Sequence, residues 1–315
     1  MYNGIINVYK EKGYTSFDVV ARMRGICGQK KIGHTGTLDP DAEGVLPVCL
    51  GKATKVCDML TDSDKVYRAV MQLGIETDTQ DLTGTVLSAC EVPVLTETEI
   101  RDVIRTFQGE IMQVPPMYSA LKVNGKKLCD LARAGVTVER KARPVTIYEI
   151  RIERVELPEI ELTVSCSKGT YIRTLCHDIG QKFGCGAAMK SLLRLQAAGF
   201  VLDEAHTLDE IQSYKAAGSL AEVITPVEQV FFVYPVLTAK PVFDVMLKNG
   251  NKMAPEQFAE YIVPQNGMLV RVRMSDGRFA AVYEYQETLG LYRPSKMFLV
   301  GLTISDEIYK RYFGF

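Results

Sequence analysis

The segment GHTGTLDPDAEGVLPVCLG, at 33–51, carries the side chains that are best placed for chemistry. Within it, DPDAEG at 39–44 places acidic groups at alternate positions before a glycine, which superficially matches a calcium-binding loop. Such a loop needs a glutamate at its twelfth position, where this chain has Leu50. A phosphate-binding loop also fails, because six residues separate the two glycines instead of four. Two interpretations of Asp39 stay open: a catalytic carboxylate, or an aspartate that caps a turn before proline.

The remaining composition excludes several classes of protein. Residues 1–10 lack the basic start and apolar core of a signal peptide, and the longest apolar run, at 230–237, is too short to span a membrane. We therefore expect a cytoplasmic protein that does not bind membranes. The eight cysteines form no C-x-x-C pair and only three histidines are present, so we expect mostly buried thiols and no metal site. No cofactor motif occurs, and we expect no cofactor.

Positive charge is concentrated in residues 118–154, although the formal net charge of the chain is −1. This segment holds nine basic and four acidic residues, a local balance of +5. Binding to a phosphate backbone needs such a local excess, and an ordinary solvated face would have the same composition. The nine basic residues are Lys122, Lys126, Lys127, Arg133, Arg140, Lys141, Arg143, Arg151 and Arg154.

The elements around these residues follow from hydrophobic periodicity and capping signals. A helix capped by Ser16 is predicted to run to Cys27, with Phe17, Val20 and Met23 on its buried face. Strands and helices then alternate without a clean βαβ repeat, which predicts an α/β (α+β) fold with a mixed, largely antiparallel sheet and flanking helices. Predicted strands lie at 45–50, 66–74, 145–157 and 159–167, and predicted helices run from a Thr96–Glu99 capping box to Gly109 and from Thr170 to Gly184.

The chain changes character near residue 235, which predicts two domains, 1–234 and 235–315. In the first domain, 112–143 is irregular and basic, with an Asn124-Gly125 turn, and is predicted to project as a long insertion with a helical piece near 128–135. The second is predicted to be a small β-barrel, with a hairpin across 275–277 and a late strand at 297–301.

The segment GHTGTLDPDAEGVLPVCLGKATK closely resembles the signature of the TruB family, the pseudouridine synthases that modify position 55 of tRNA. The resemblance implies the pseudouridine synthase fold and, more weakly, a PUA-like RNA-binding domain at 235–315. The chain departs from the family at Glu11, where proline is usual, and at Cys129, where an aromatic residue is common. Further family-like blocks follow in order: GYTSFDVV at 13–20, SDKVYRAVMQLG at 63–74 followed by ETDTQDLTG, then 107–128, 132–150, CSKGTYIRTLCHDIG at 166–180 and LLRLQAAGF at 192–200.

The resemblance implies a role for each matching residue. Asp39 is the expected nucleophile and Arg173 its ion-pair partner, while Tyr67 stacks on the target base and is a candidate for removing the proton from C5. Arg173 falls in the first turn of a predicted helix, and both the arginine and the positive helix end should lower the pKa of Asp39. Substrate-binding roles are implied for His34, Tyr171 and Leu192, and in the basic insertion for Lys122, Lys126, Lys127 and Arg143.

The implied reaction converts uridine to pseudouridine at position 55 in the T loop of tRNA, after the base has been flipped out. The insertion at 112–143 is expected to clamp the T stem and loop. We expect a monomer that needs no obligatory protein partner. Two alternatives stay open: a tRNA-binding folding chaperone in which catalysis is secondary, and a pseudouridine synthase that depends on a guide RNA.

Overall fold

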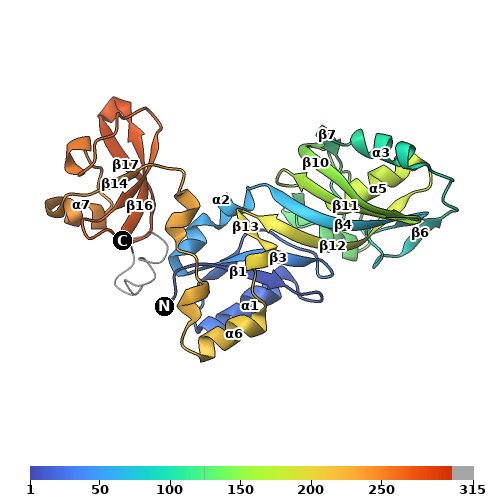
Figure 1. Cartoon of the computed structure of the whole chain (residues 1–315), viewed down its shortest axis with the longest axis horizontal. Coiled ribbons are helices and arrows are strands. Elements are labelled where there is room, and N and C mark those ends of the chain that lie inside the picture. Colours follow the sequence, from blue (N-terminus) through green and yellow to red (C-terminus); the bar gives the residue numbers. More distant parts are fainter. Residues whose placement is uncertain (124, 300–315) are drawn as a thin grey trace.

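A computed structural model describes residues 1–123 and 125–299 of the chain. It contains a nine-stranded sheet with helices packed against it and, at one end, a separate four-stranded sheet (Figure 1). Among the described residues, no helix combines the length and the apolar character that crossing a membrane would require.

The large sheet has the order β1-β3-β12-β4-β11-β10-β7, with β2 paired to β3 and β13 paired to β12. Every neighbouring pair is antiparallel except β3 and β12, which are parallel. The predicted mixed, largely antiparallel sheet is therefore confirmed. Its strands are β1 (Gly4–Lys10), β2 (Ile32–His34), β3 (Glu43–Leu50), β4 (Lys65–Leu73), β7 (Gly109–Gln113), β10 (Arg143–Glu156), β11 (Glu159–Cys166), β12 (Ala187–Ala197) and β13 (Phe200–Val201).

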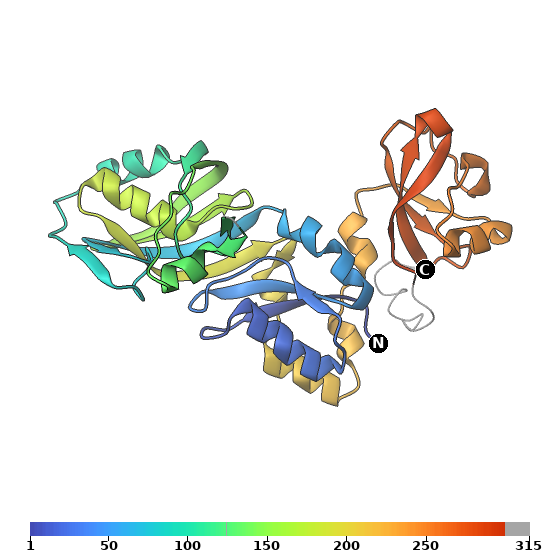
Figure 2. The ribbon, with the colours of Figure 1, turned by 180° about the vertical axis from the view of Figure 1, so that it is seen from behind.

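Two of the hydrophobic cores lie between this sheet and the helices α1, α3, α5 and α6. One joins α3 and α5 to strands β4, β10, β11 and β12, and the other joins α1 and α6 to β1 and β3. Helices α1 and α6 lie side by side (Figure 2). The pair α1 and α6 therefore covers a different part of the sheet from the pair α3 and α5. The helices are α1 (Ser16–Cys27), α2 (Cys57–Thr61), α3 (Glu97–Arg105), α5 (Ile172–Phe183) and α6 (Leu208–Ala216), and a small hairpin is formed by β5 (Ile75–Thr77) and β6 (Val86–Ala89).

The start of α1 differs from the prediction in its cap and in its buried face. Thr15 is the cap, because its side chain accepts the Asp18 N–H while Asp18 accepts the Thr15 N–H, so Ser16 is the first helical residue. Phe17 is 63% exposed and lies under the guanidinium of Arg24 instead of facing the core. The Ser16 hydroxyl therefore does not cap the helix. It is buried and forms a hydrogen bond outside the helix.

Two other predicted boundaries were also wrong. The helix that begins after Thr96 does have the capping box with Glu99, but it ends at Arg105, because Gly109 already begins strand β7. Strand β3 begins at Glu43, earlier than predicted, since antiparallel pairing with β1 extends to Gly44.

The basic insertion leaves the sheet and returns to it at the same place. Strands β7 and β10 pair directly, with Gln113 opposite Arg143, so the insertion lies between these two residues. It contains β8 (Lys122–Val123), β9 (Lys126–Lys127) and α4 (Leu128–Arg133). The predicted helical piece is α4, whereas Asn124 of the predicted turn lies outside the described residues.

The C-terminal sheet has the order β14-β15-β16-β17. The predicted hairpin is formed by β15 and β16, and bridges from Ala239 to Phe258 and from Met253 to Tyr292 link the two edges of the sheet, which makes it barrel-like. Strand β17 ends at Met297, so the strand predicted at 297–301 shares only its first residue with β17; residues 298–299 are not in a strand, and residues 300–315 lie outside the described residues. The elements are β14 (Val236–Thr238), α7 (Asp244–Lys248), β15 (Leu269–Arg273), β16 (Phe279–Gln286) and β17 (Leu291–Met297).

Candidate active site

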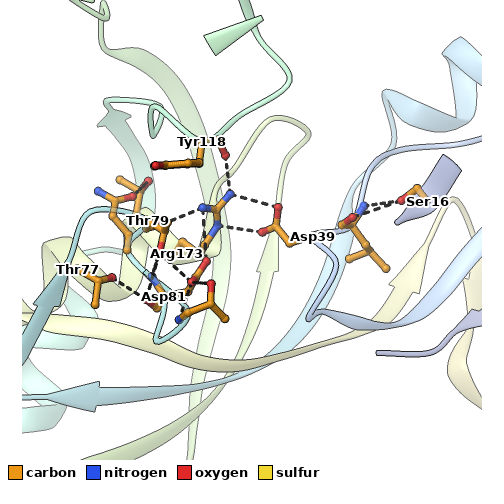
Figure 3. Close-up of polar contacts among 11 residues, drawn as sticks. Ser16, Asp39, Thr77, Thr79, Asp81, Tyr118 and Arg173 are labelled. Atoms are coloured by element: carbon orange, nitrogen blue, oxygen red, sulfur yellow. Dashed lines mark hydrogen bonds and ion pairs between the residues drawn. The ribbon is translucent and has the colours of Figure 1, made fainter. Parts of the chain in front are cut away.

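The loop between β2 and β3 presents Asp39 because both of its neighbours are fixed. The Leu38 N–H donates to Ser16 Oγ at 2.9 Å, which ties the loop to the start of α1 (Figure 3). On the other side, the buried Lys10 Nζ donates to Pro40 O at 3.0 Å and to Ala42 O. The carboxylate therefore projects from a loop that is anchored on both sides.

Asp39 forms a two-point ion pair with Arg173. Arg173 Nε lies 2.9 Å from Asp39 Oδ2, and Arg173 Nη2 donates to Asp39 Oδ1 at 3.2 Å (Figure 3). The arginine side chain is 5% exposed, whereas the aspartate side chain is 38% exposed. The pair therefore has one open side, on which a substrate can reach the carboxylate.

Three further groups fix the guanidinium of Arg173. Its Nη1 donates to Thr79 O and its Nη2 donates to Tyr118 O, both at 2.8 Å. Asp81 Oδ2 lies 3.6 Å from Nη1, and the other Asp81 oxygen accepts a hydrogen bond from Thr79 Oγ1 at 2.8 Å (Figure 3). The planar donors of the Arg173 guanidinium thus hold this side chain between the carboxylates of Asp39 and Asp81. Tyr118 belongs to the insertion, so the insertion contacts the ion pair.

The expected direction of the Asp39 pKa was wrong. Burial raises the pKa of Asp39 above its ordinary value, Arg173 lowers it, and the nearby Asp81 raises it. Although part of its surface is open, the carboxylate is closely surrounded by the loops that carry these groups, and desolvation outweighs the attraction of the arginine. The ion pair with Arg173 opposes this shift and favours the charged form of the carboxylate.

Tyr67 lies on β4, close enough to Asp39 for the charges of the two groups to interact. Its side chain is 8% exposed and belongs to the same apolar cluster as Leu38 and Leu192. Burial raises the pKa of the Tyr67 phenol, and the charge of Arg194 opposes that effect. Leu192 lies on the paired strand β12, opposite Ala69 of β4.

Tyr171 caps the start of α5 and is clamped by Gln113. The Tyr171 N–H donates to Gln113 Oε1 at 2.8 Å, and Gln113 Nε2 donates to Tyr171 O at 3.0 Å. Burial raises the pKa of Tyr171, and the charges of Arg173 and Arg143 are among the effects that lower it. The exposed Arg143 therefore lies close enough to the site to act on it.

The other predicted site residues lie on β2 and on the insertion. His34, at the end of β2, is half-buried with Nδ1 3.1 Å from Gly36 O, and burial lowers the pKa of its imidazole. Lys122, Lys126 and Lys127 are exposed on the β8–β9 hairpin of the insertion. They form an exposed, positively charged surface on this hairpin.

Several residues of the site were given no role in it by the sequence analysis. They have no signal as isolated residues, because their roles depend on contacts between distant segments. The described residues contain no group of three or more histidine, cysteine, aspartate or glutamate side chains that could hold a metal ion. The residues that sequence reasoning missed are Lys10, Ser16, Asp81, Gln113, Tyr118 and Arg194.

Comparison with known proteins gives consistent matches. Residues 24–172 match the N-terminal domain of TruB family pseudouridylate synthases, and residues 173–231 match the C-terminal domain of tRNA pseudouridylate synthase B. A tRNA pseudouridine synthase B of Lachnoclostridium phytofermentans is 50% identical over 94% of this chain and 100% of its own length. One of Clostridium perfringens is 45% identical over 90% of this chain and 96% of its own length.

Solved structures with the same fold are also similar. A chain of an H/ACA RNP bound to a substrate RNA containing 2'-deoxyuridine matches with a TM-score of 0.70 and 26% identity, covering 94% of this chain and 85% of that chain. A chain of a Cbf5-Nop10-Gar1 complex matches with a TM-score of 0.69 and 28% identity, covering 97% and 86%.

Proposed function

We propose, because this chain belongs to the TruB family of pseudouridylate synthases, that it isomerises uridine to pseudouridine in tRNA with Asp39 as the nucleophile. The single observation that carries this proposal is the two-point ion pair between Asp39 and the buried Arg173 at an open site. We further propose position 55 of the T loop as the target, and the cytoplasm as the place where the protein acts, as a monomer.

The reaction needs a charged carboxylate and a group that accepts the C5 proton, but it involves no change in oxidation state. The N1–C1′ bond breaks, the uracil turns, and a C5–C1′ bond forms. The proton on C5 then leaves, its electron pair forms the C5–C6 double bond, and N1 gains a proton, so the atoms balance. Asp39 attacks the nucleoside covalently and is released when the new bond forms. Whether the attack falls on C6 or on C1′ does not change what the site must provide.

The surrounding residues have separate tasks. Arg173 keeps Asp39 charged and oriented, because its donors are fixed by Thr79 O and Tyr118 O. Tyr67 stacks on the flipped base and takes the C5 proton. Tyr171 and Leu192 enclose the uracil, and His34 positions the neighbouring nucleotides.

The insertion supplies the electrostatic contact with tRNA. Lys122, Lys126, Lys127 and Arg143 are all exposed, so they can bind phosphates without loss of packing. Flipping the base costs a few kcal/mol of unstacking, which phosphate contacts and stacking on Tyr67 must offset. The contact between Tyr118 O and Arg173 couples closure of the insertion over the T stem and loop to the geometry of the ion pair.

The other candidate is a synthase that depends on a guide RNA, and the matches to tRNA pseudouridine synthase B do not favour it. The test is to incubate unmodified tRNA with the purified protein alone and to map pseudouridine by sequence position. We expect pseudouridine at position 55 without any other RNA or protein. If modification requires an added guide RNA, the standalone proposal is wrong. If tRNA is bound and refolded but never modified, the chaperone alternative replaces it.

A further inference from the structure

Arg194, on β12, is a buried cation to which the function proposed above assigns no task. Its side chain is 1% exposed, and none of the ion pairs formed within the described part of the chain includes it. Its Nη2 is buried with no hydrogen-bond partner among those residues. Burying a cation without a carboxylate partner is destabilising, so a residue of this kind needs a reason for being there.

The strands place Arg194 between the two proposed catalytic elements. In the sheet, Arg194 lies opposite Tyr67 of β4 and opposite Gly44 of β3. Gly44 has a φ of +104°, and a Cβ there would approach Arg194 O to 2.3 Å. Strands β3 and β12 therefore approach each other more closely than any residue other than glycine at position 44 would allow. Arg194 Nε donates to Val45 O at 2.6 Å.

The guanidinium also reaches the underside of the loop that carries Asp39. Its Nη1 lies 3.7 Å from the position that a Cβ on Gly36 would occupy. Gly36 and Gly44 flank this loop on either side. Arg194 therefore lies next to both ends of the Asp39 loop, with its backbone against Gly44 and its guanidinium near Gly36, and next to the strand that carries Tyr67.

The charge of Arg194 acts on four titratable groups. Burial is the main cause that lowers the pKa of His34 and the pKa values of Lys10 and Lys65, the latter two to about 8, and the positive charge of Arg194 contributes to the lowering in all three. For Tyr67, burial raises the pKa of the phenol, while the charge of Arg194 and a hydrogen-bond interaction with it lower that pKa. Tyr67 is thus the one member of this set whose charged form Arg194 favours.

Two acidic groups from other elements face Tyr67 as well. Cys166 on β11 and Asp39 both raise the pKa of the phenol, and neither can stabilise its anion. Arg194 is therefore the cation that opposes burial and negative charge at this phenol. This position gives a task to an arginine that lies where a hydrophobic residue would pack at lower cost.

We propose that Arg194 is a positioning residue for the proton-transfer step, acting through Tyr67 and the loop that carries Asp39. This proposal rests on the function proposed above. The C5 proton passes to the Tyr67 phenolate oxygen, the C5–H electron pair forms the C5–C6 double bond, and the phenol later returns its proton to solvent. Arg194 favours the phenolate before the transfer and holds both catalytic groups in register.

The test compares Arg194→Met with Arg68→Met. Methionine is close to arginine in length but uncharged, and Arg68 is the next residue to Tyr67 on β4, exposed on the other face of the sheet. For Arg194→Met we expect unchanged or higher Tm, kcat lower by about 10- to 100-fold, and KM within about threefold, because Arg194 cannot touch tRNA. The limb of the pH–rate profile that rises with phenol ionisation should move to higher pH by about one unit. Arg68→Met should behave as wild type.

A merely structural role would lower the rate equally at every pH. The double variant with Tyr67→Phe adds a second readout: because Arg194 acts in part through Tyr67, adding Arg194→Met to Tyr67→Phe should slow the reaction by clearly less than Arg194→Met slows the wild type. An unmoved pH limb, a wild-type kcat, or fully additive losses would each overturn the proposal.

If Arg194→Met does not fold, Arg194→Lys decides. It keeps the charge but loses the fork that bonds Val45 O, so we expect a lower kcat with the pH limb unmoved; a wild-type kcat, or a limb moved to higher pH, would contradict the proposal. Failure of the proposed function would look different, because the wild-type protein itself would then form no pseudouridine.

Discussion

Replacing Arg173 by lysine keeps a positive charge but removes the fork that meets Asp39. The guanidinium bonds both oxygens of Asp39, at 2.9 and 3.2 Å, and donates to Thr79 O and Tyr118 O at 2.8 Å. A single ammonium group cannot reach all four acceptors. Loss of two charge-assisted hydrogen bonds, taken at about 1.5–2 kcal/mol each because Asp39 is partly exposed, raises the barrier by about 3–4 kcal/mol.

This barrier corresponds to a kcat lower by about 100- to 1,000-fold. The affinity for tRNA should change by less than about threefold, because Arg173 is buried behind Asp39. Single-turnover release of tritium from tRNA labelled at C5 of uridine measures the first quantity, and filter binding measures the second. Arg154→Lys, at an exposed ion pair on β10, is the control and should react at the wild-type rate. A rate for Arg173→Lys within about fivefold of wild type, or a loss confined to binding, would refute the proposed role of the ion pair.

Four further predictions follow from the same geometry. Asp81→Asn should lower kcat by about 10-fold or more with little effect on tRNA affinity, because Asp81 helps to fix Arg173; equal losses in both would argue for direct RNA contact. In Arg173→Met, the pKa of Asp39 should rise further, because the main group that lowers it is gone. The ionised fraction of Asp39 then falls at a higher pH on acidification, so the acid limb of the pH–rate profile should begin at higher pH. An unmoved limb would show that the profile does not report the ionisation of Asp39. Replacing Lys122, Lys126 and Lys127 together by alanine should weaken tRNA binding and reduce its salt dependence while leaving kcat at saturating tRNA unchanged; an unchanged salt slope would place the phosphates elsewhere. Gly44→Ala, whose Cβ would meet backbone at 2.3 Å, should lower Tm and activity more than Gly13→Ala, where φ is also positive but the space is open; equal effects would mean that the close approach to β12 is unimportant.

Elements with a strong local signal were predictable from the sequence. The Thr96–Glu99 capping box and the left-handed glycine at 184 are properties of neighbouring residues, and both were found where they were expected. Ser16 was assigned as a cap although Thr15 competes for the same role, and the capping box with Asp18 decides in favour of Thr15. Local patterns therefore predicted most elements, with errors at their ends.

The site was less predictable because it depends on contacts between distant segments. The resemblance to a family pointed to Asp39 and Arg173, yet no local pattern indicates that Thr79 O, Tyr118 O and Asp81 surround the same guanidinium. The pKa of Asp39 was assigned the wrong direction for a related reason: desolvation depends on what packs around a carboxylate, and the sequence shows only its charged partner.

The central claim is that Asp39 is the nucleophile of a tRNA pseudouridine synthase. The most direct measurement maps pseudouridine in unmodified tRNA after treatment with wild-type protein, Asp39→Asn and Asp41→Asn. Asp41 is exposed two residues along the same loop, so its variant controls for charge and folding. We predict pseudouridine with the wild type and with Asp41→Asn, and none with Asp39→Asn, although that variant still binds tRNA. Pseudouridine formed by Asp39→Asn at the wild-type rate would contradict the claim.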